Sequence, residues 1–240
     1  MNDRIDDAEL DRPTWLVHQE HELSQQRCVG SYAATRAALD RSYHGVYTVA
    51  RQQMQDSLIR RCLAFGGRNA RAPWLLFTCG AMGVGKGHAL RQLHARSAFL
   101  AGHFCSVDPD RFRKGLPEAR AYANRRMWRV LGEHTQREAG YLSEIALEEC
   151  LKVSRLVVYD SSLRDVGFWR RNIARIREEY PQFALAIYHF VAPRDVILAR
   201  ALSAEAAGQP AADAAVPWDT CLWRGGGGAV DASAWHGSAI

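Results

Sequence analysis

The sequence predicts an α/β fold in which helices flank a parallel β-sheet. Three observations lead to this prediction. Short apolar runs typical of buried strands alternate with longer segments of helical periodicity. The first apolar run leads directly into a glycine-rich loop, and a helical pattern follows that loop. Consecutive apolar runs are far enough apart for helical crossovers, which parallel strands require.

Residues 71–203 are predicted to form this domain. The four apolar runs that we expect to be strands are the run from Trp74 to the residue before Gly80, Phe104–Val107, Leu156–Tyr159 and Ala184–Val191. The expected helices begin at Lys86, at Pro117, near Thr135, at Phe168 and after Pro193. Right-handed crossovers would connect the strands.

Two segments flank the predicted domain. Residues 1–70 are polar as far as about Ser42, and we expect a partly ordered, helical extension there. Its best helical pattern runs from Tyr47 to Leu63, with an apolar face and with polar residues elsewhere, namely Arg51, Gln53, Gln55 and Arg60. Residues 204–240 are rich in alanine, glycine and proline. Such a composition buries little apolar surface and predicts a mobile tail.

The loop after the first strand has the pattern G-x-x-x-x-G-K, met by Gly80, Gly85 and Lys86. Glycines let backbone N–H groups converge on a phosphate, and the lysine adds positive charge for the β- and γ-phosphates. The helix that follows directs the positive end of its dipole to the same point. A strand, this loop and a helix in that order indicate a P-loop NTPase-type fold. The predicted nucleotide-binding residues are Gly80, Ala81, Met82, Gly83, Val84, Gly85, Lys86, Gly87 and His88.

The residue after the lysine departs from this pattern. A serine or threonine there binds magnesium through its hydroxyl, whereas this chain has Gly87. Magnesium commonly keeps several water ligands, so phosphate oxygens, waters and a carboxylate could hold it instead. Weak or absent catalysis is the alternative consequence.

Charged residues follow the second and third predicted strands, at the edge where open parallel sheets bind ligands. Phosphoryl transfer needs a base, a metal and positive charge. Asp110 is the candidate base, and Asp160 is the candidate that holds the metal through water or binds the acceptor. Asp108 either binds substrate or caps a helix or turn. The arginines that would neutralise charge are Arg113, Arg164 and Arg200.

Three further candidate positions, His134, Glu138 and Arg200, each leave two interpretations open. His134 and Glu138 lie one helical turn apart and form either an acceptor-binding pair or a surface pair. A metal site there is weakly supported, because no third ligand lies at a suitable spacing. Arg200 lies on a predicted helix, and helical arginines are usually solvated.

Composition and charge narrow the classes of function. Of 240 residues, 48% are hydrophobic and 24% are charged, as in soluble globular proteins. A net charge of +5 favours an anionic partner such as a nucleotide. The six cysteines are scattered, which argues against zinc and for a reducing, cytoplasmic compartment. The acidic N-terminus does not look like a secretory signal, and we expect no membrane span.

Together these segments resemble the zeta toxin family of P-loop kinases, from about Arg71 to Ala201. Besides the phosphate loop, the resemblance rests on the D-x-D-x-F-R segment from Asp108 to Arg113 and on the segment from Asp160 to Arg164. It implies transfer of the γ-phosphate of ATP or GTP, with Mg²⁺, to a hydroxyl group. In bacterial members that hydroxyl belongs to a UDP-linked amino sugar.

The resemblance also implies roles for single residues. Asp110 matches the family's base, Lys86 its loop lysine, and Asp160 and Glu138 its acceptor-binding residues. After the last helix, where related sequences carry further arginines, residues 203–210 of this chain contain none.

Three functions are therefore compatible with the sequence. The first is a kinase that acts on a small or nucleotide-linked hydroxyl acceptor, such as a nucleotide sugar. The second is a degenerate kinase that binds nucleotide and serves as an interaction module, which Gly87 favours. The third is a polynucleotide 5′-hydroxyl kinase, whose arginine-rich helices would contact a phosphate backbone.

Overall fold

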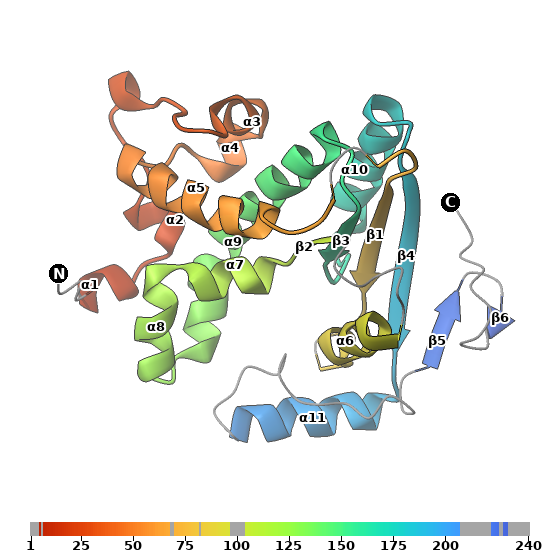
Figure 1. The fold of residues 1–240 in the computed structure, drawn as a ribbon. Coiled ribbons are helices and arrows are strands. Elements are labelled where there is room, and N and C mark those ends of the chain that lie inside the picture. The colour runs from red at the N-terminus through yellow and green to blue at the C-terminus, as the bar shows by residue number, and fades with distance from the viewer. Residues whose placement is uncertain are drawn as a thin grey trace. The chain divides into compact units, whose positions relative to one another are not determined.

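The computed structural model of the protein describes residues 5, 7–67, 70–81, 83–96, 104–206, 222–225 and 228–229. The chain divides into two compact units (Figure 1). The helical unit comprises Met1–Ala64 and Asp108–Glu149, and the sheet unit comprises Phe65–Val107 and Cys150–Ile240. The linear pattern did not indicate that residues 108–149 group with the N-terminal extension.

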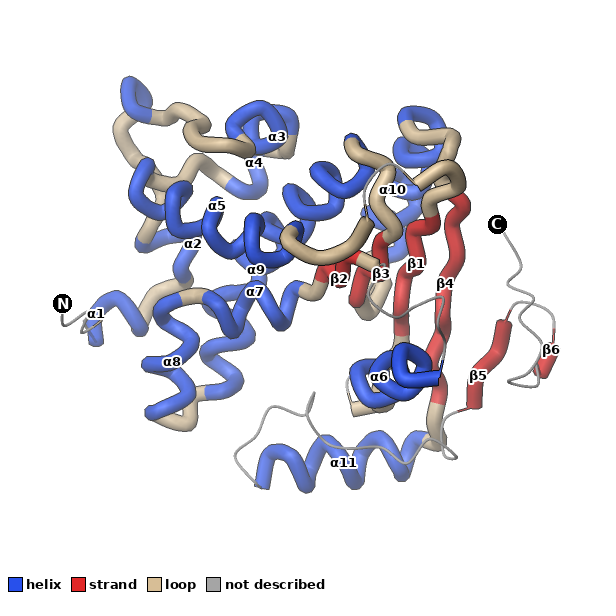
Figure 2. The backbone as a smooth tube through the Cα atoms, in the orientation of Figure 1, coloured by secondary structure: helices blue, strands red, loops and turns tan. Residues whose placement is uncertain are grey.

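The sheet unit contains the predicted parallel sheet. Its strands are β1 (Trp74–Cys79), β2 (Cys105–Val107), β3 (Val157–Asp160), β4 (Ala184–Val191), β5 (Leu222–Gly225) and β6 (Gly228–Ala229). Their order is β2-β3-β1-β4-β5-β6, and the first four are parallel (Figure 2). This confirms the α/β fold class, and each predicted strand lies within one residue of its expected limits.

Helices pack on the sheet through the alternating sides of its strands. Leu76, Val158 and Ala186 share one core cluster with Ala89 of α6 (Lys86–Arg96), and Ile197 of α11 (Arg194–Ala206) packs against this cluster. The next residue along two of these strands belongs to another cluster. Phe77, Tyr159 and Trp169 of α10 (Val166–Glu179) have ring centroids 5.1 to 5.9 Å apart. Successive strand residues point to opposite faces, so α6 and α10 contact different faces of the sheet.

The carboxyl ends of the strands lie at one edge of the sheet. In Figure 1, α6 and the start of α11 lie at the end to which the arrowheads of β1 and β4 point. This is the edge at which open parallel sheets bind ligands. The structure therefore places the predicted phosphate loop where the topology rule requires it.

The last two strands were not predicted. β5 pairs antiparallel with β4, and β6 pairs antiparallel with β5. The other residues from 207 to the C-terminus lie outside the described residues, so the mobility of the tail stays a prediction. No described helix has the length and apolarity that crossing a membrane demands.

The helical unit is built from short N-terminal helices and from longer helices that follow them in the chain. Its elements are α1 (Asp7–Leu10), α2 (Thr14–Val17), η1 (Leu23–Gln25), α3 (Ala33–Ala38), α4 (Arg41–His44), α5 (Val49–Leu63), α7 (Pro109–Gly115), α8 (Pro117–Asn124) and most of α9 (Trp128–Lys152). α8 begins at the predicted proline. α9 begins seven residues before Thr135, where the pattern had placed its start.

Local chemistry explains several helix starts in this unit. The Thr48 hydroxyl accepts a hydrogen bond from the Arg51 backbone N–H, 3.4 Å away, which caps α5. Asp108 caps α7 in the same way, and Pro109 occupies the first turn, where its missing N–H costs nothing. Tyr122 of α8 packs in a small core with Leu10 and Leu131.

Candidate functional site

The phosphate loop joins β1 to α6 through glycines in conformations that other residues rarely adopt. Gly80, Gly83 and Gly85 have φ angles of 148°, 81° and 97°. A Cβ atom on Gly80 would also lie 2.5 Å from the Phe190 carbonyl oxygen on β4. Only glycine fits there, because both the backbone angle and the neighbouring strand exclude a side chain.

The loop is anchored at its centre and held closed at its base. Val84 is buried, and its N–H donates to the Ala81 carbonyl at 3.2 Å. The Lys86 ammonium donates to the Gly80 carbonyl at 3.1 Å, across the loop. Burial raises the pKa of the Cys79 thiol, and the positive charge of Lys86 opposes that rise. The ammonium therefore lies at the base of the loop, at the first turn of α6.

Most of the predicted nucleotide-binding residues form this loop. Ala81 is exposed, and Gly85, Lys86, Gly87 and His88 are half-buried. Met82 lies outside the described residues. Glycine backbone, one ammonium group and a helix N-terminus on the same loop are the donors that a phosphate group needs. The loop geometry fits a nucleotide phosphate, although its contacts with a nucleotide stay a prediction.

At the end of β3, Asp160 lies beside a residue that the sequence analysis missed. The Thr78 hydroxyl on β1 donates to the Asp160 carboxylate at 2.7 Å, and these two residues are paired in the β1–β3 register. By strand periodicity both side chains point to the face of Leu76 and Val158, which α6 covers. A threonine in an apolar strand looks like an ordinary strand residue, so only the register could have revealed this pair.

Two of the predicted arginines, Arg164 and Arg200, lie in the sheet unit. Arg164 is exposed in the segment between β3 and α10, and Arg200 is half-buried on α11. Their roles in charge neutralisation stay predictions.

The acidic residues after β2 belong to the helical unit, on and beside α7. The Asp108 carboxylate accepts from the Asp110 N–H at 2.8 Å, so Asp108 is a helix cap. Asp110 forms an ion pair with Arg113 and keeps about half of its side chain exposed. Arg113 also donates to Thr135 at 3.0 Å and to Gln136 at 2.6 Å on α9. Arg113 thereby fixes the candidate base with respect to α9.

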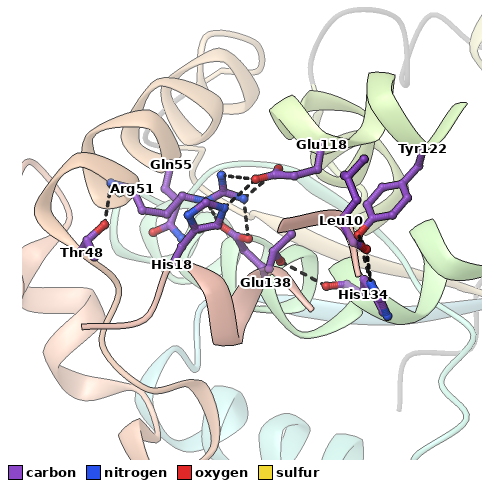
Figure 3. A network of polar contacts seen from close by, with 10 residues as sticks. Leu10, His18, Thr48, Arg51, Gln55, Glu118, Tyr122, His134 and Glu138 are labelled. Carbon is purple, nitrogen blue, oxygen red and sulfur yellow. Dashed lines mark hydrogen bonds and ion pairs between the residues drawn. The ribbon is translucent and has the colours of Figure 1, made fainter. Parts of the chain in front are cut away.

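A buried ionic cluster surrounds the predicted residue Glu138 (Figure 3). The Arg51 guanidinium of α5 lies between two carboxylates. It donates to Glu138 at 2.7 and 2.8 Å and to Glu118 of α8 at 2.8 and 3.0 Å. Gln55 donates to Glu138 at 2.8 Å, and a His18 ring nitrogen lies 2.7 Å from Glu118. Glu138 is 0% exposed, so the interpretation of a surface pair is wrong for it.

The cluster shifts the proton affinities of its members. Burial raises the pKa of Glu118, but hydrogen bonds from His18 and Arg51 outweigh burial and lower it to about 2. Burial also lowers the pKa of Arg51, yet its bonds to Glu138 and Glu118 leave that pKa well above its usual value. Glu118 and Arg51 therefore both stay charged at neutral pH.

His134, the predicted partner of Glu138, belongs to a different set of contacts. Its Nδ1 atom lies 3.0 Å from the Tyr122 hydroxyl and 3.2 Å from the Leu10 carbonyl oxygen (Figure 3). Burial, with the negative charge of Glu118, raises the pKa of Tyr122 to about 12. His134 therefore holds α1 and α8 to α9 rather than pairing with Glu138.

The described residues contain no group of three or more histidine, cysteine, aspartate or glutamate side chains that could hold a metal ion by themselves. Magnesium bound through nucleotide phosphates needs fewer protein ligands, because it keeps several waters. The pair of Thr78 and Asp160 supplies one oriented carboxylate at the ligand edge of the sheet. The donor set thus fits a magnesium ion that is held mainly by phosphates and water.

The parallel sheet, the glycine loop and the helix after it define the protein as one with a P-loop NTPase-type fold. Comparison with family models then gives the family: the zeta toxin model matches residues 59–200. This range covers more than half of the chain, and the protein belongs to the zeta toxin family, whose members have P-loop, kinase-like character. The family generally binds nucleotide together with Mg²⁺. No curated protein gave a significant match.

Comparison with solved structures supports the same fold. A similar chain comes from the structural characterization of the PezAT chromosomal toxin–antitoxin system of Streptococcus pneumoniae. It is 16% identical, with a TM-score of 0.52, and the match covers 63% of this chain and 60% of the other. This chain therefore matches less than two thirds of the length of that structure. At this identity the similarity concerns the fold.

Proposed function

We propose that the protein is a kinase that transfers the γ-phosphate of ATP or GTP, with Mg²⁺, to a hydroxyl group of a small or nucleotide-linked acceptor. The observation that carries this proposal is the loop from Gly80 to Lys86, whose glycine angles and lysine geometry suit a nucleotide phosphate. Membership of the zeta toxin family supports it. A nucleotide sugar is the acceptor class that we favour.

The roles of the residues follow from their chemistry. Loop N–H groups and the Lys86 ammonium bind the phosphates, and the Asp160 carboxylate holds the metal or the acceptor. Asp110 removes the proton of the acceptor hydroxyl, and its partial exposure leaves it open to a ligand. Arg164 and Arg200 neutralise charge that develops during transfer. When bound, Mg²⁺ would neutralise the phosphate oxygens.

A specific observation favours a second function, a nucleotide-binding module without transferase activity. Glu138, which the family resemblance assigns to the acceptor, is fully buried and already accepts hydrogen bonds from Arg51 and Gln55. Gly87 also lacks the hydroxyl of related loops. In this alternative the helical unit would have replaced acceptor binding by a structural contact.

The first experiment measures nucleotide binding by calorimetry with ATP and GTP, in the presence of Mg²⁺. The Lys86→Met variant should lose most of its affinity for the nucleotide, because methionine lacks the ammonium group that binds the negatively charged phosphates. Lys152→Met is the matched control, since Lys152 is exposed at the end of α9. Equal affinity in both variants and the unchanged protein would contradict the proposed nucleotide site.

The second experiment separates the two functions by following labelled γ-phosphate. Sugar nucleotides and 5′-hydroxyl oligonucleotides serve as alternative acceptors. Asp110→Asn should abolish transfer and leave nucleotide affinity nearly unchanged, whereas Asp11→Asn, at an exposed position, should preserve both. Binding without transfer to any acceptor would favour the module. Transfer only to oligonucleotides, with steep salt dependence, would indicate a polynucleotide kinase.

A further inference from the structure

The structure contains a hydroxyl group close to the ligand edge of the sheet whose role the phosphate loop does not explain. Thr78 is 0% exposed. Its hydroxyl donates to Oδ1 of Asp160 at 2.7 Å. A buried hydroxyl without a partner would be costly, so this hydrogen bond is strongly favoured in the folded protein.

Thr78 is held rigidly, which makes it suited to orient another side chain. It pairs with β3 at Asp160 on one side and with β4 at Tyr188 on the other. Its carbonyl oxygen accepts from the Ser161 N–H at 3.1 Å, immediately beyond β3. A threonine side chain also has restricted rotation about its first bond. The hydroxyl therefore has a fixed place with respect to the end of β3.

Asp160, in contrast, lies at the last position of its strand and is only half-buried. A carboxylate at such a position can turn about two side-chain bonds. The hydrogen bond at Oδ1 restricts both rotations, and strand periodicity places the pair on the face that α6 covers. One carboxylate orientation is thereby selected before any ligand binds.

We propose that Thr78 is a positioning residue for the magnesium site, and that its hydrogen bond to Asp160 compensates for the absent hydroxyl at Gly87. The inference rests on the proposed nucleotide-binding function and deepens it. In loops with serine or threonine after the lysine, the loop itself offers a hydroxyl to the metal. Here the oriented Asp160 carboxylate takes over the recruitment of magnesium, through water or directly.

Partners that orient a metal ligand typically contribute 10- to 100-fold to metal affinity. We therefore expect Thr78→Val, which keeps the shape but removes the hydroxyl, to raise the half-saturating Mg²⁺ concentration for nucleotide binding by about 10-fold or more. Thr78→Ser keeps the hydroxyl, and its half-saturating Mg²⁺ concentration should lie within about 3-fold of that of the unchanged protein. Binding without Mg²⁺ should not change, because the loop and Lys86 are intact.

The experiment titrates Mg²⁺ into protein with a fluorescent ATP analogue and follows binding directly, so it needs no transfer activity. Thr14→Val is the matched control, since Thr14 is also buried and donates to the His134 carbonyl at 3.2 Å in the helical unit. The Asp160→Asn variant and the double variant that combines it with Thr78→Val complete a double-mutant cycle. If Thr78 acts through Asp160, its replacement has no further effect in the Asp160→Asn background.

The outcomes distinguish this inference from the function on which it rests. No Mg²⁺-dependent nucleotide binding by the unchanged protein would overturn the proposed function itself. Normal binding with an unchanged Mg²⁺ requirement in Thr78→Val would overturn only the inference, as would additive effects in the double variant. If Thr78→Val does not fold, Thr78→Cys replaces it, because a thiol is a weak donor of similar size. An unchanged Mg²⁺ requirement there would overturn the inference too.

Discussion

Replacing Arg51 by methionine should destabilise the helical unit more than any surface change on the same helix. Arg51 contributes the guanidinium that lies between the carboxylates of Glu118 and Glu138. Methionine keeps much of the side-chain length but removes the charge and the side-chain hydrogen bonds. The two buried carboxylates would then lack this cation and would keep the contacts with His18 and Gln55.

Two independent considerations give the size of the expected loss in unfolding free energy. Removing one member of a buried ion pair typically costs about 3–5 kcal/mol. The Glu118 pKa gives a similar figure, since lowering it from its ordinary 4.5 to about 2 corresponds to about 3 kcal/mol at neutral pH. Against a total stability of about 5–15 kcal/mol, such a loss is large. Replacing the ion pairs by apolar groups together would be a different perturbation, because no charge would be left unpaired.

The stability difference between the unchanged protein and the Arg51→Met variant should depend on pH. In the unchanged protein, the low pKa of Glu118 contributes stability above the unfolded value of 4.5, and this is lost as pH falls towards about 2. In the Arg51→Met variant, burial without the guanidinium raises the pKa of Glu118 above its value in the unchanged protein. The cost of this buried charge is therefore largest near neutral pH and disappears once the carboxylate is protonated. The difference between the two proteins should shrink as the solution is acidified.

Urea unfolding at about pH 7 and about pH 3.5 measures this difference. Arg61→Met is the matched control, because Arg61 is exposed on the same helix and donates to the Ser57 carbonyl at 3.4 Å. Equal unfolding free energies for the Arg51 and Arg61 variants would refute the reasoning. A deficit that grew at acid pH would refute the charge argument in particular.

Two further predictions concern single positions. Gly80→Ala should abolish nucleotide binding in a fluorescence titration, because the new Cβ would lie 2.5 Å from the Phe190 carbonyl oxygen at a φ of 148°, whereas Gly132→Ala, with no atom within 4 Å of its Cβ, should bind normally. His18→Ala should shift acid unfolding to higher pH, monitored by circular dichroism, because Glu118 loses the first of the hydrogen bonds that lower its pKa. An unchanged acid midpoint would show that Arg51 alone sets this pKa.

The four parallel strands could be predicted from the sequence because their signals are local. Each of them is a short apolar run, and the glycines of the loop adopt backbone angles that favour glycine. The cap at Asp108 and the proline at Pro109 also gave a local signal for α7. The sequence analysis left two interpretations of Asp108 open, a substrate-binding residue and a cap, because an aspartate after a strand can have either role.

The contacts of the candidate site could not be predicted in the same way. The hydrogen bond between Thr78 and Asp160 joins residues 82 positions apart, and it depends on the register between β1 and β3. A shift of that register by one residue would turn one side chain to the other face. The sequence pattern sets the strands but not this register, so the threonine carried no sign of its partner.

The buried cluster shows why polarity along a helix can mislead. Arg51 and Gln55 of α5 were placed outside the apolar face, because apolar periodicity defines only the face that packs against apolar neighbours. In the structure both are buried, at 6% and 0% exposure, because α8 and α9 present carboxylates to them. Burial of a charge needs a partner, and that partner is 67 and 87 residues away for Arg51.

The same contact weighs on the choice between the two proposed functions. Glu138 can serve an acceptor only if the acceptor offers more than Arg51 and Gln55 already provide, because both would lose their hydrogen bonds to Glu138. An enzyme that used Glu138 would have to meet that cost, of about 3–5 kcal/mol, in every turnover. A kinase on this scaffold is therefore expected to bind its acceptor without Glu138, which stays the fixed counter-ion of Arg51 on α5.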